Sequence, residues 1–413
     1  MMKKIYLLSI FCLFLIQIVP AQTWSKKSNG FPGDARTNAV SFVIGDNAYI
    51  GLGYNSESWF NSIYYNDFWK YDSKADAWSK IADFPESKKT NAVAFSINGK
   101  GYVGLGSTED SSFSQSFYEY DPATDTWTKI ADYPGGERHS SVAFTIGDAA
   151  YVGTGMTPED DDDGYYVSTN EFWKYENSTW TKIASIPNSL DSFYDQDRYD
   201  ATAFSLNGFG YVAGGTSGGF YISAPSNICK YDPATDTWTQ DLFSHNLGTN
   251  TIWSYTLGNE AVIQVKYGCY KYNSTERVLE SIDHDPYGIG DEAISGILFF
   301  VINNTAYMTF TVTGSFFSPV YNTDLWFYED SSLSCLETSL PTPTELSYLN
   351  NKLEIKLTEK AGICKIYDLN GLILIEKELF AGSNTIDFTD ITNKVCIVSV
   401  ETANNKCVRK IIK

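Results

Sequence analysis

The chain has 413 residues, with 30 Lys and Arg against 50 Asp and Glu, and its formal net charge is −20. This length allows two domains and a sizeable core. The acidity lies in residues 22–341, which carry 18 basic and 41 acidic residues, whereas residues 342–413 carry 10 and 9. Because such acidity repels phosphate backbones, the composition argues against a nucleic-acid partner.

The first 21 residues have the pattern of a secretory signal peptide. Lys3 and Lys4 precede an apolar run from Ile5 to Val19, and small residues follow at Pro20 and Ala21. The run is too short for a membrane anchor, and no later stretch approaches about 18 apolar residues. We therefore expect residues 1–21 to be removed and the mature chain to be exported, without a transmembrane segment, to the extracellular space or the outer-membrane surface.

The octet YDPATDTW occurs twice, at 120–127 and at 231–238, and relatives of it surround further Tyr and Trp residues. A second block, of the type AVAFSINGKGYVGLG, precedes each of four octet-like segments. Its tyrosines, Tyr49, Tyr102, Tyr151 and Tyr211, are 53, 49 and 60 residues apart. A period near 50 is typical of a propeller array.

Each repeat predicts four strands. The AVAFSI run is the first strand, and an Asn-Gly or Gly-Asp turn leads into the second, GYVGLG. FWKYD is the third strand. Asp121-Pro122-Ala123-Thr124 suits a type I turn into the fourth strand, at Thr126 to Thr128. The octet is thus predicted to be the hairpin between the two outer strands of a blade.

These motifs resemble the kelch repeat family, whose units carry a glycine pair after the second strand, then a tyrosine and a tryptophan. The resemblance covers about 300 residues. The glycine pair mostly reads GLG or GTG here, and only Gly214-Gly215 keeps it. The last repeat lacks a W-[ST]-K strand, but Trp24-Ser25-Lys26 precedes the first. We therefore expect a six-bladed all-β propeller over residues 22–335, closed by the N-terminal strand.

The C-terminal part predicts a separate small β-sandwich over residues 347–413, after a proline-containing linker at 336–346. Its YDLNG at 367–371 and its ending VRKIIK resemble the type A sorting domain of the type IX secretion system, although Lys394 and Cys396 replace the usual glycine and tyrosine. The resemblance implies an export address, often cleaved, whose partner is the type IX machinery.

Four repeats place a basic residue just before the first strand: Arg36, Lys89, Arg138 and Arg198. Around one channel mouth they would form an anion site suited to a carboxylate. The alternative is that each pairs with an acid such as Glu137, Asp195, Asp197 or Asp200, because repeated positions in arrays usually serve packing.

The loops between second and third strands mix aromatic residues with Asn, Ser and Gly. Six aromatic residues are candidates for stacking on sugar rings or gripping a protein: Trp59, Tyr165, Tyr166, Phe220, Tyr221 and Phe317. The alternative is that they pack the loops onto the blades.

No cofactor or metal is expected. When Gly164 is taken as the sixth residue of a calcium loop around the acidic run Asp160–Asp163, the first position is Glu159 and the twelfth is Asn170, so the final glutamate is missing. Calcium is left open beside a solvated acidic loop. The three histidines form no ligand pattern of the kind that the copper site of the galactose oxidases needs. Six cysteines follow the signal peptide without a CxxC pair, and Cys229 and Cys269 are expected to be buried in strands.

Three functions remain open on the sequence. The first is a non-enzymatic surface module that binds glycan or protein through the aromatic loops. The second is a sugar-modifying enzyme, an epimerase or mutarotase of an acidic sugar, with Arg36, Arg138 and Arg198 holding the carboxylate and with Glu137 and His139 nearby as acid or base. The third is a structural surface protein, and fold alone does not choose among them.

Overall fold

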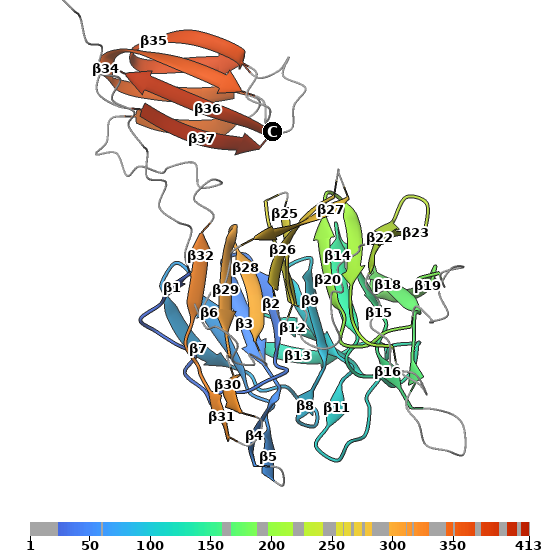
Figure 1. The fold of residues 1–413 in the computed structure, drawn as a ribbon. Coiled ribbons are helices and arrows are strands. Elements are labelled where there is room, and N and C mark those ends of the chain that lie inside the picture. The colour runs from blue at the N-terminus through green and yellow to red at the C-terminus, as the bar shows by residue number, and fades with distance from the viewer. Residues whose placement is uncertain are drawn as a thin grey trace, which may run out of the picture.

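The structure is a computed structural model, and it contains strands and turns throughout its described part (Figure 1). The described residues are 24–58, 61–158, 167–187, 197–217, 227–242, 253–258, 260–265, 268–274, 277–282, 297–310, 312–315, 318–329, 344–349, 352–367, 373–387, 395–402 and 406–412. In these residues no helix has the length and apolar character needed to cross a membrane.

Six antiparallel sheets of four strands form the larger unit, and each is one predicted repeat. Blades 1 and 2 consist of β2 (Val40–Ile44), β3 (Asn47–Gly51), β6 (Phe68–Asp72) and β7 (Ala77–Ile81), and of β9 (Val93–Ile97), β10 (Lys100–Gly104), β12 (Phe117–Asp121) and β13 (Thr126–Lys129). Blades 3 and 4 consist of β14 (Val142–Ile146), β15 (Ala149–Gly153), β18 (Phe172–Glu176) and β19 (Thr179–Ile183), and of β20 (Thr202–Leu206), β21 (Phe209–Ala213), β22 (Asn227–Asp232) and β23 (Thr237–Leu242). Blades 5 and 6 consist of β24 (Trp253–Leu257), β25 (Glu260–Val265), β26 (Gly268–Asn273) and β27 (Val278–Ile282), and of β28 (Leu298–Ile302), β29 (Thr305–Thr309), β32 (Trp326–Glu329) and β1 (Ser25–Lys26).

The six sheets form a closed ring. Each innermost strand contacts the innermost strand of the next blade, in the order β2, β9, β14, β20, β24 and β28, and β28 contacts β2 again. The buried apolar residues fall into six clusters, and each cluster joins two successive blades, including blade 6 to blade 1. The predicted six-bladed all-β propeller is therefore confirmed.

The N-terminal strand completes the last blade, as the sequence predicts. β1 pairs with β32 through Ser25 opposite Phe327 and Lys26 opposite Trp326. The backbone N–H of Lys27 continues the pairing by donating to the carbonyl of Leu325 at 2.7 Å. Trp24 contacts the ring of Tyr328, at a centroid distance of 5.6 Å, and so anchors the start of the ring to its end.

The repeated octet is the hairpin between the third and fourth strands. In blade 2 the four residues after Asp121 make the turn, and Thr126 pairs back to Asp121. The turn is longer than the expected type I turn by one residue, because Asp125 takes a left-handed conformation with φ of 52°. An aspartate tolerates this conformation better than most side chains do.

The same octet also holds the preceding blade. The carboxylate of Asp125 accepts hydrogen bonds from the Tyr120 hydroxyl at 2.8 Å and from the Ala82 backbone N–H at 2.9 Å. The indole of Trp127 donates to the carbonyl of that same Ala82 at 3.0 Å. In blade 4, Asp236 and Trp238 make the same two bonds to Ala184 of blade 3. The two identical octets therefore make the same joint in two blades.

Close packing between blades also explains small residues in the second strands. A side chain at Gly101 of blade 2 would overlap the Phe42 ring of blade 1, and one at Gly210 of blade 4 would overlap Phe144 of blade 3. Cys229 and Cys269 are buried free thiols in β22 and β26, as expected from the sequence. Burial raises the pKa of Cys269 to about 12.

The C-terminal residues form a five-stranded antiparallel sheet of their own: β33 (Thr344–Leu349), β34 (Lys352–Tyr367), β35 (Ile373–Asp387), β36 (Val395–Thr402) and β37 (Lys406–Ile412). β34 pairs with β33 along its first half and with β36 along its second half, and its register with β35 shifts between Leu357 and Ala361. Both halves contribute to one buried cluster. The structure thus describes one bent sheet, and the two-sheet sandwich stays a prediction.

Candidate functional site

One end of the ring carries the described parts of the loops between second and third strands and of the links between one blade and the next. We call this end the loop face; it lies at the bottom of Figure 1. Four short two-stranded ladders stand on it: β4 (Tyr54–Ser58) with β5 (Asn61–Tyr64), β8 (Lys89–Thr90) with β11 (Ser107–Thr108), β16 (Met156–Thr157) with β17 (Val167–Ser168), and β30 (Val312–Ser315) with β31 (Ser318–Tyr321). These ladders give the loops defined backbone geometry.

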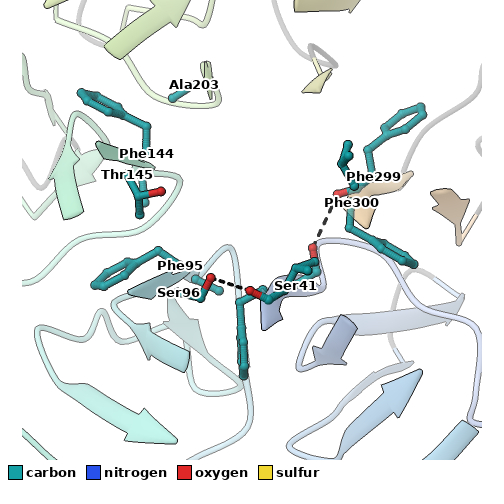
Figure 2. A pocket seen from close by; sticks show the side chains of 13 residues that line it. Ser41, Phe95, Ser96, Phe144, Thr145, Ala203, Phe299 and Phe300 are labelled. Atoms are coloured by element: carbon teal, nitrogen blue, oxygen red, sulfur yellow. Dashed lines mark hydrogen bonds between the residues drawn. The ribbon is translucent and has the colours of Figure 1, made fainter. Parts of the chain in front are cut away.

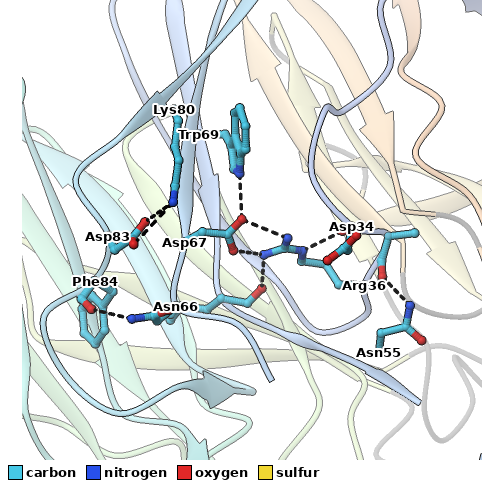
Figure 3. A network of polar contacts seen from close by, with 11 residues as sticks. Asp34, Arg36, Asn55, Asn66, Asp67, Trp69, Lys80, Asp83 and Phe84 are labelled. Atoms are coloured by element: carbon cyan, nitrogen blue, oxygen red, sulfur yellow. Dashed lines mark hydrogen bonds and ion pairs between the residues drawn. The ribbon is translucent and has the colours of Figure 1, made fainter. Parts of the chain in front are cut away.

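The four predicted basic residues lie at this end, but they are buried. The exposed fractions of Arg36, Lys89, Arg138 and Arg198 are 0, 1, 1 and 0%. Figure 3 shows the surroundings of Arg36. Its guanidinium forms a two-pronged ion pair with Asp67, donates from Nε to the Asp34 carbonyl at 2.9 Å, and lies over the Tyr65 ring at 4.0 Å.

Arg36 keeps Asp67 ionised. Burial of Asp67 opposes ionisation, but hydrogen bonds and the charge of Arg36, with a hydrogen bond from Trp69, outweigh it and lower the pKa of Asp67. The Trp69 indole donates to Asp67 at 2.8 Å. The pair is therefore an ionised internal contact rather than an open anion site.

The equivalent positions in blades 2 and 3 also have internal partners. Lys89 pairs with Glu86 and donates to the hydroxyls of Ser114 at 2.7 Å and Ser116 at 3.0 Å. Burial opposes ionisation of Glu86 as well, but the bonds from Lys89 and Ser116 prevail and lower its pKa.

Blade 3 holds its arginine less tightly than blade 1 does. Arg138 is 3.8 Å from Glu171, which also pairs with Lys182. The Arg138 Nε and the indole nitrogen of Trp173, the counterpart of Trp69, have no hydrogen-bond partner among the residues that the structure describes. Glu171 is the counterpart of Asp67. Its longer side chain pairs with Lys182 and does not bond the tryptophan indole as Asp67 does in blade 1.

Each arginine supports a left-handed turn of its own blade. The Nη1 atoms of Arg36, Arg138 and Arg198 donate to the carbonyls of Leu52, Thr154 and Gly214 at 3.3, 3.3 and 3.2 Å. These three acceptors open the loops after the second strands, with φ of 59°, 58° and 59°. Leucine and threonine rarely adopt this conformation, so the arginine stabilises the turn where the usual first glycine is missing.

The same basic positions join neighbouring blades through their backbones. The N–H groups of Gly53, Gly106 and Gly155 donate to the carbonyls of Lys89, Arg138 and Arg198 of the following blade, at 2.8, 2.9 and 2.8 Å. These contacts favour the alternative that the repeated cations serve packing. Their predicted contact with a ligand stays a prediction, because no ligand is present to test it.

In blades 1 to 3 the acids that pair with the cations are Asp67, Glu86 and Glu171, none of which is among the acids expected from the sequence. A signal for two of them was present, since Asp67 and Glu171 each precede the same FWKY segment. The third strand begins there, directly beside the arginine-supported turn. An acid repeated at this register is therefore a structural partner of the cation.

The six aromatic candidates, Trp59, Tyr165, Tyr166, Phe220, Tyr221 and Phe317, lie outside the described residues. Their described neighbours pack within the loops. Tyr54 and Tyr64 face each other across β4 and β5 with ring centroids 5.5 Å apart. The Tyr321 hydroxyl of blade 6 bonds the backbone N–H of Ser56 at 3.1 Å and its carbonyl at 3.3 Å, so it ties two hairpins together.

Exposed apolar side chains occur beside this tyrosine brace. Ile63 on β5 is 38% exposed and Val320 on β31 is 53% exposed. Both belong to the hairpins that Tyr321 joins: Ile63 pairs with Asn55, the neighbour of Ser56, and Val320 directly precedes Tyr321. The braced hairpins thus offer apolar surface beside hydroxyl and amide groups on a fixed backbone, which suits recognition of an amphipathic ligand.

His139 also lies on the loop face, half-buried against Phe113 with ring centroids 4.4 Å apart. Its Nδ1 is 3.0 Å from the Ser140 hydroxyl. Burial lowers the pKa of His139, and Asp200 only partly opposes this effect. The imidazole is therefore neutral at physiological pH.

The axis of the ring contains a cavity of about 310 Å³ between the innermost strands (Figure 2). Its lining includes Ser41, Ser96, Thr145 and Phe299, and among the lining residues in the described part of the chain none is charged. Ser96 donates to the carbonyl of Val43 of the preceding blade at 2.6 Å. This serine hydroxyl thus bonds a backbone carbonyl at the edge of the neighbouring blade's inner strand, so a polar side chain of the cavity lining has a structural role.

Metal binding has no support in the described ranges, where no group of three or more His, Cys, Asp or Glu side chains could hold an ion. The acidic run Asp160–Asp163 lies outside those ranges.

Comparison with known proteins gives a local match. No protein-family model matches the chain. A segment of 75 residues is 37% identical to N-acetylneuraminate epimerase of Shigella sonnei, and equally to those of Escherichia coli K12 and Shigella flexneri. It covers 18% of this chain and 20% of those proteins, so the chain spans about a fifth of the length of the curated relatives it matches.

Among solved structures, one described as "Structure of YjhT" aligns with 68% of this chain and 86% of its own, with 18% identity and a TM-score of 0.48. The fold assignment depends on the strand pairing and the ring of contacts given above, not on this alignment. What the chain and these curated relatives share is one stretch of 75 residues.

Proposed function

We propose that the protein is an exported recognition module that binds a glycan through its loop face and performs no chemistry on it. The observation that carries the proposal is the pair of hairpins joined by Tyr321, which presents Ile63 and Val320 on a braced backbone. A preorganised surface loses little entropy when a ligand binds. The local similarity to sugar epimerases favours a sugar over a protein as the ligand.

A sugar-modifying enzyme is the second candidate, and the same local similarity favours it. An epimerase of an acidic sugar needs a site for the carboxylate and a group that moves a proton. The cations predicted for the carboxylate are buried and bonded internally, which speaks against this role. His139 would be the group closest to the required chemistry, because its imidazole is neutral and half-buried.

The N-terminal and C-terminal segments support a proposed destination outside the cell or on its outer membrane. Residues 1–21 would direct export, and residues 347–413 would serve as the address read by a type IX secretion machinery. In the native host, a chain without residues 347–413 should stay inside the outer membrane while the full chain reaches the surface or the medium. Surface display of the truncated chain would contradict this assignment.

The binding proposal is tested on a glycan array with the purified full chain and two matched variants. Val320→Asp places a charge on the braced hairpins, and Val278→Asp places one on β27, where the side chain is 38% exposed. We expect Val320→Asp to lose at least about tenfold in affinity, because ligand binding would strip water from the introduced carboxylate. Equal loss in both variants, or no glycan bound by the native chain, would overturn the proposal.

The enzyme candidate is tested in parallel by following N-acetylneuraminate with the native chain by NMR. Accelerated epimerisation that His139→Gln abolishes would replace the recognition module by an enzyme. An unchanged rate with both proteins supports recognition without chemistry.

A further inference from the structure

We infer that the ligand of the loop face is an uncharged glycan. This inference rests on the proposed function and names the ligand class, and it runs against the acidic sugar that the local sequence similarity suggests. Three features of the loop face support it: its four predicted basic residues are buried and bonded to protein acceptors, the residues that follow them are neutral, and its described segments contain more acidic than basic residues.

Two of the four basic side chains on which an acidic sugar would depend, Lys89 and Arg36, are already bonded to protein acceptors. The Lys89 ammonium has three N–H groups, and Glu86, Ser114 and Ser116 accept from it. The Arg36 guanidinium makes four hydrogen bonds to protein acceptors, two of them to Asp67. A ligand carboxylate would have to displace these partners and open a site whose cations are at most 1% exposed.

The residue after each cation is neutral. These residues are Thr37, Thr90, His139 and Tyr199. Each pairs with the start of a loop-face loop, as Thr37 does with Tyr54 and His139 with Met156. The side chains that directly follow the four cations therefore carry hydroxyl and imidazole groups, and those of Thr37, His139 and Tyr199, which are only partly buried, can bind sugar hydroxyls through neutral hydrogen bonds.

The described segments of the loop face carry an excess of acid. They contain 13 Asp and Glu against 6 Lys and Arg. The counted ranges are 27–39, 52–58, 61–67, 82–92, 105–116, 130–141, 154–158, 167–171, 184–187, 197–201, 214–217, 297, 310, 312–315 and 318–325. Four of the six basic residues are the buried ones. A carboxylated ligand approaching this end of the ring would be repelled, whereas an uncharged ligand would not.

The test compares one neutral oligosaccharide, lactose or a neutral hit from the array, with its sialylated form on the full chain. We expect the neutral sugar to bind at least about fivefold more tightly at low ionic strength, because only the sialylated form meets the negative field. The affinity of the neutral sugar should change by less than about twofold between 0.01 and about 1 M salt.

A gain-of-function variant sharpens the test. Val320→Arg adds a cation to the braced hairpins and should raise binding of the sialylated form severalfold, whereas Val278→Arg on β27 should leave it unchanged. Tighter binding of the sialylated form by the native chain, weakened by salt, would overturn the inference while the proposed function stands. Binding of neither sugar class anywhere on the array would overturn both.

Discussion

The outer hairpins and the loop-face hairpins lie at opposite ends of the same blades and differ in how they are built. The outer hairpins repeat closely, and Asp125 and Asp236 make the same bonds to the preceding blade. The loop-face loops of blades 1, 3 and 4 share a left-handed first residue that a buried arginine supports, and they then diverge in length and composition. The repeated end therefore holds the ring together, and the varied end is the part free to acquire a ligand.

We expect the largest loss of stability from a change at the start of the loop-face loop of blade 1, next to the pair of Arg36 and Asp67. Asp67→Asn leaves the buried charge of Arg36 without its partner and should cost about 3 kcal/mol in the free energy of unfolding at pH 7. Asp83→Asn, at a pair that is about half exposed, should cost less than about 0.5 kcal/mol. Urea denaturation of the three proteins measures both values.

The pH dependence gives the same pair a second test. Because the pKa of Asp67 is lowered in the folded protein, its contribution is present above the unfolded pKa of about 3.9 and is lost as the pH falls through the folded value. The difference between the native chain and Asp67→Asn should therefore shrink below pH 4. A difference that stays constant down to the acid transition would show that Asp67 does not act through its charge.

The repeated end is tested by Asp125→Ala in blade 2 and Asp236→Ala in blade 4. Each removes acceptors for a tyrosine hydroxyl and for a backbone N–H of the preceding blade, so each should cost about 2 kcal/mol. Asp125→Asn keeps one acceptor oxygen and should restore about half of the loss. Thermal unfolding should show similar losses for the two alanine variants and a smaller loss for Asp125→Asn; very different losses in the two octets would mean that the repeats are not equivalent joints.

The varied end should respond more weakly in stability. Tyr321→Phe removes the hydroxyl that joins two hairpins and should cost about 1 kcal/mol. Amide exchange in residues 54–64 should accelerate, since their brace is lost. Tyr64→Phe keeps the stacked ring and serves as the control. Equal exchange rates in both variants would remove the brace from the account.

The sequence predicts most of the ring because the same pattern of strands and turns recurs in several repeats. The octet, the AVAFSI strand and the unmatched Trp24 strand were enough to predict the blade, the count of six and the closure. The partners of the cations were not predictable from charge alone, since Arg36 finds Asp67 across 31 residues through the register of β3 and β6. Sequence proximity pointed to Glu137 and Asp200 instead, because it ignores which strand ends meet.

The loop face is less predictable because its segments do not repeat. Trp59 and Phe317 are candidate ligand contacts because of their aromatic side chains alone, and neither lies in the described residues. The brace from Tyr321 to Ser56 joins positions 265 residues apart and carries no local signal. It exists only because the ring brings blade 6 beside blade 1.

The most direct measurement of the central claim is the footprint of a bound glycan by hydrogen–deuterium exchange on the full chain. We predict slower exchange in residues 54–64 and 312–321 when the sugar is present, and unchanged exchange in the octets at 120–127 and 231–238. Protection confined to the octets, with none on the loop-face hairpins, would contradict the assignment of architecture to one end of the ring and recognition to the other.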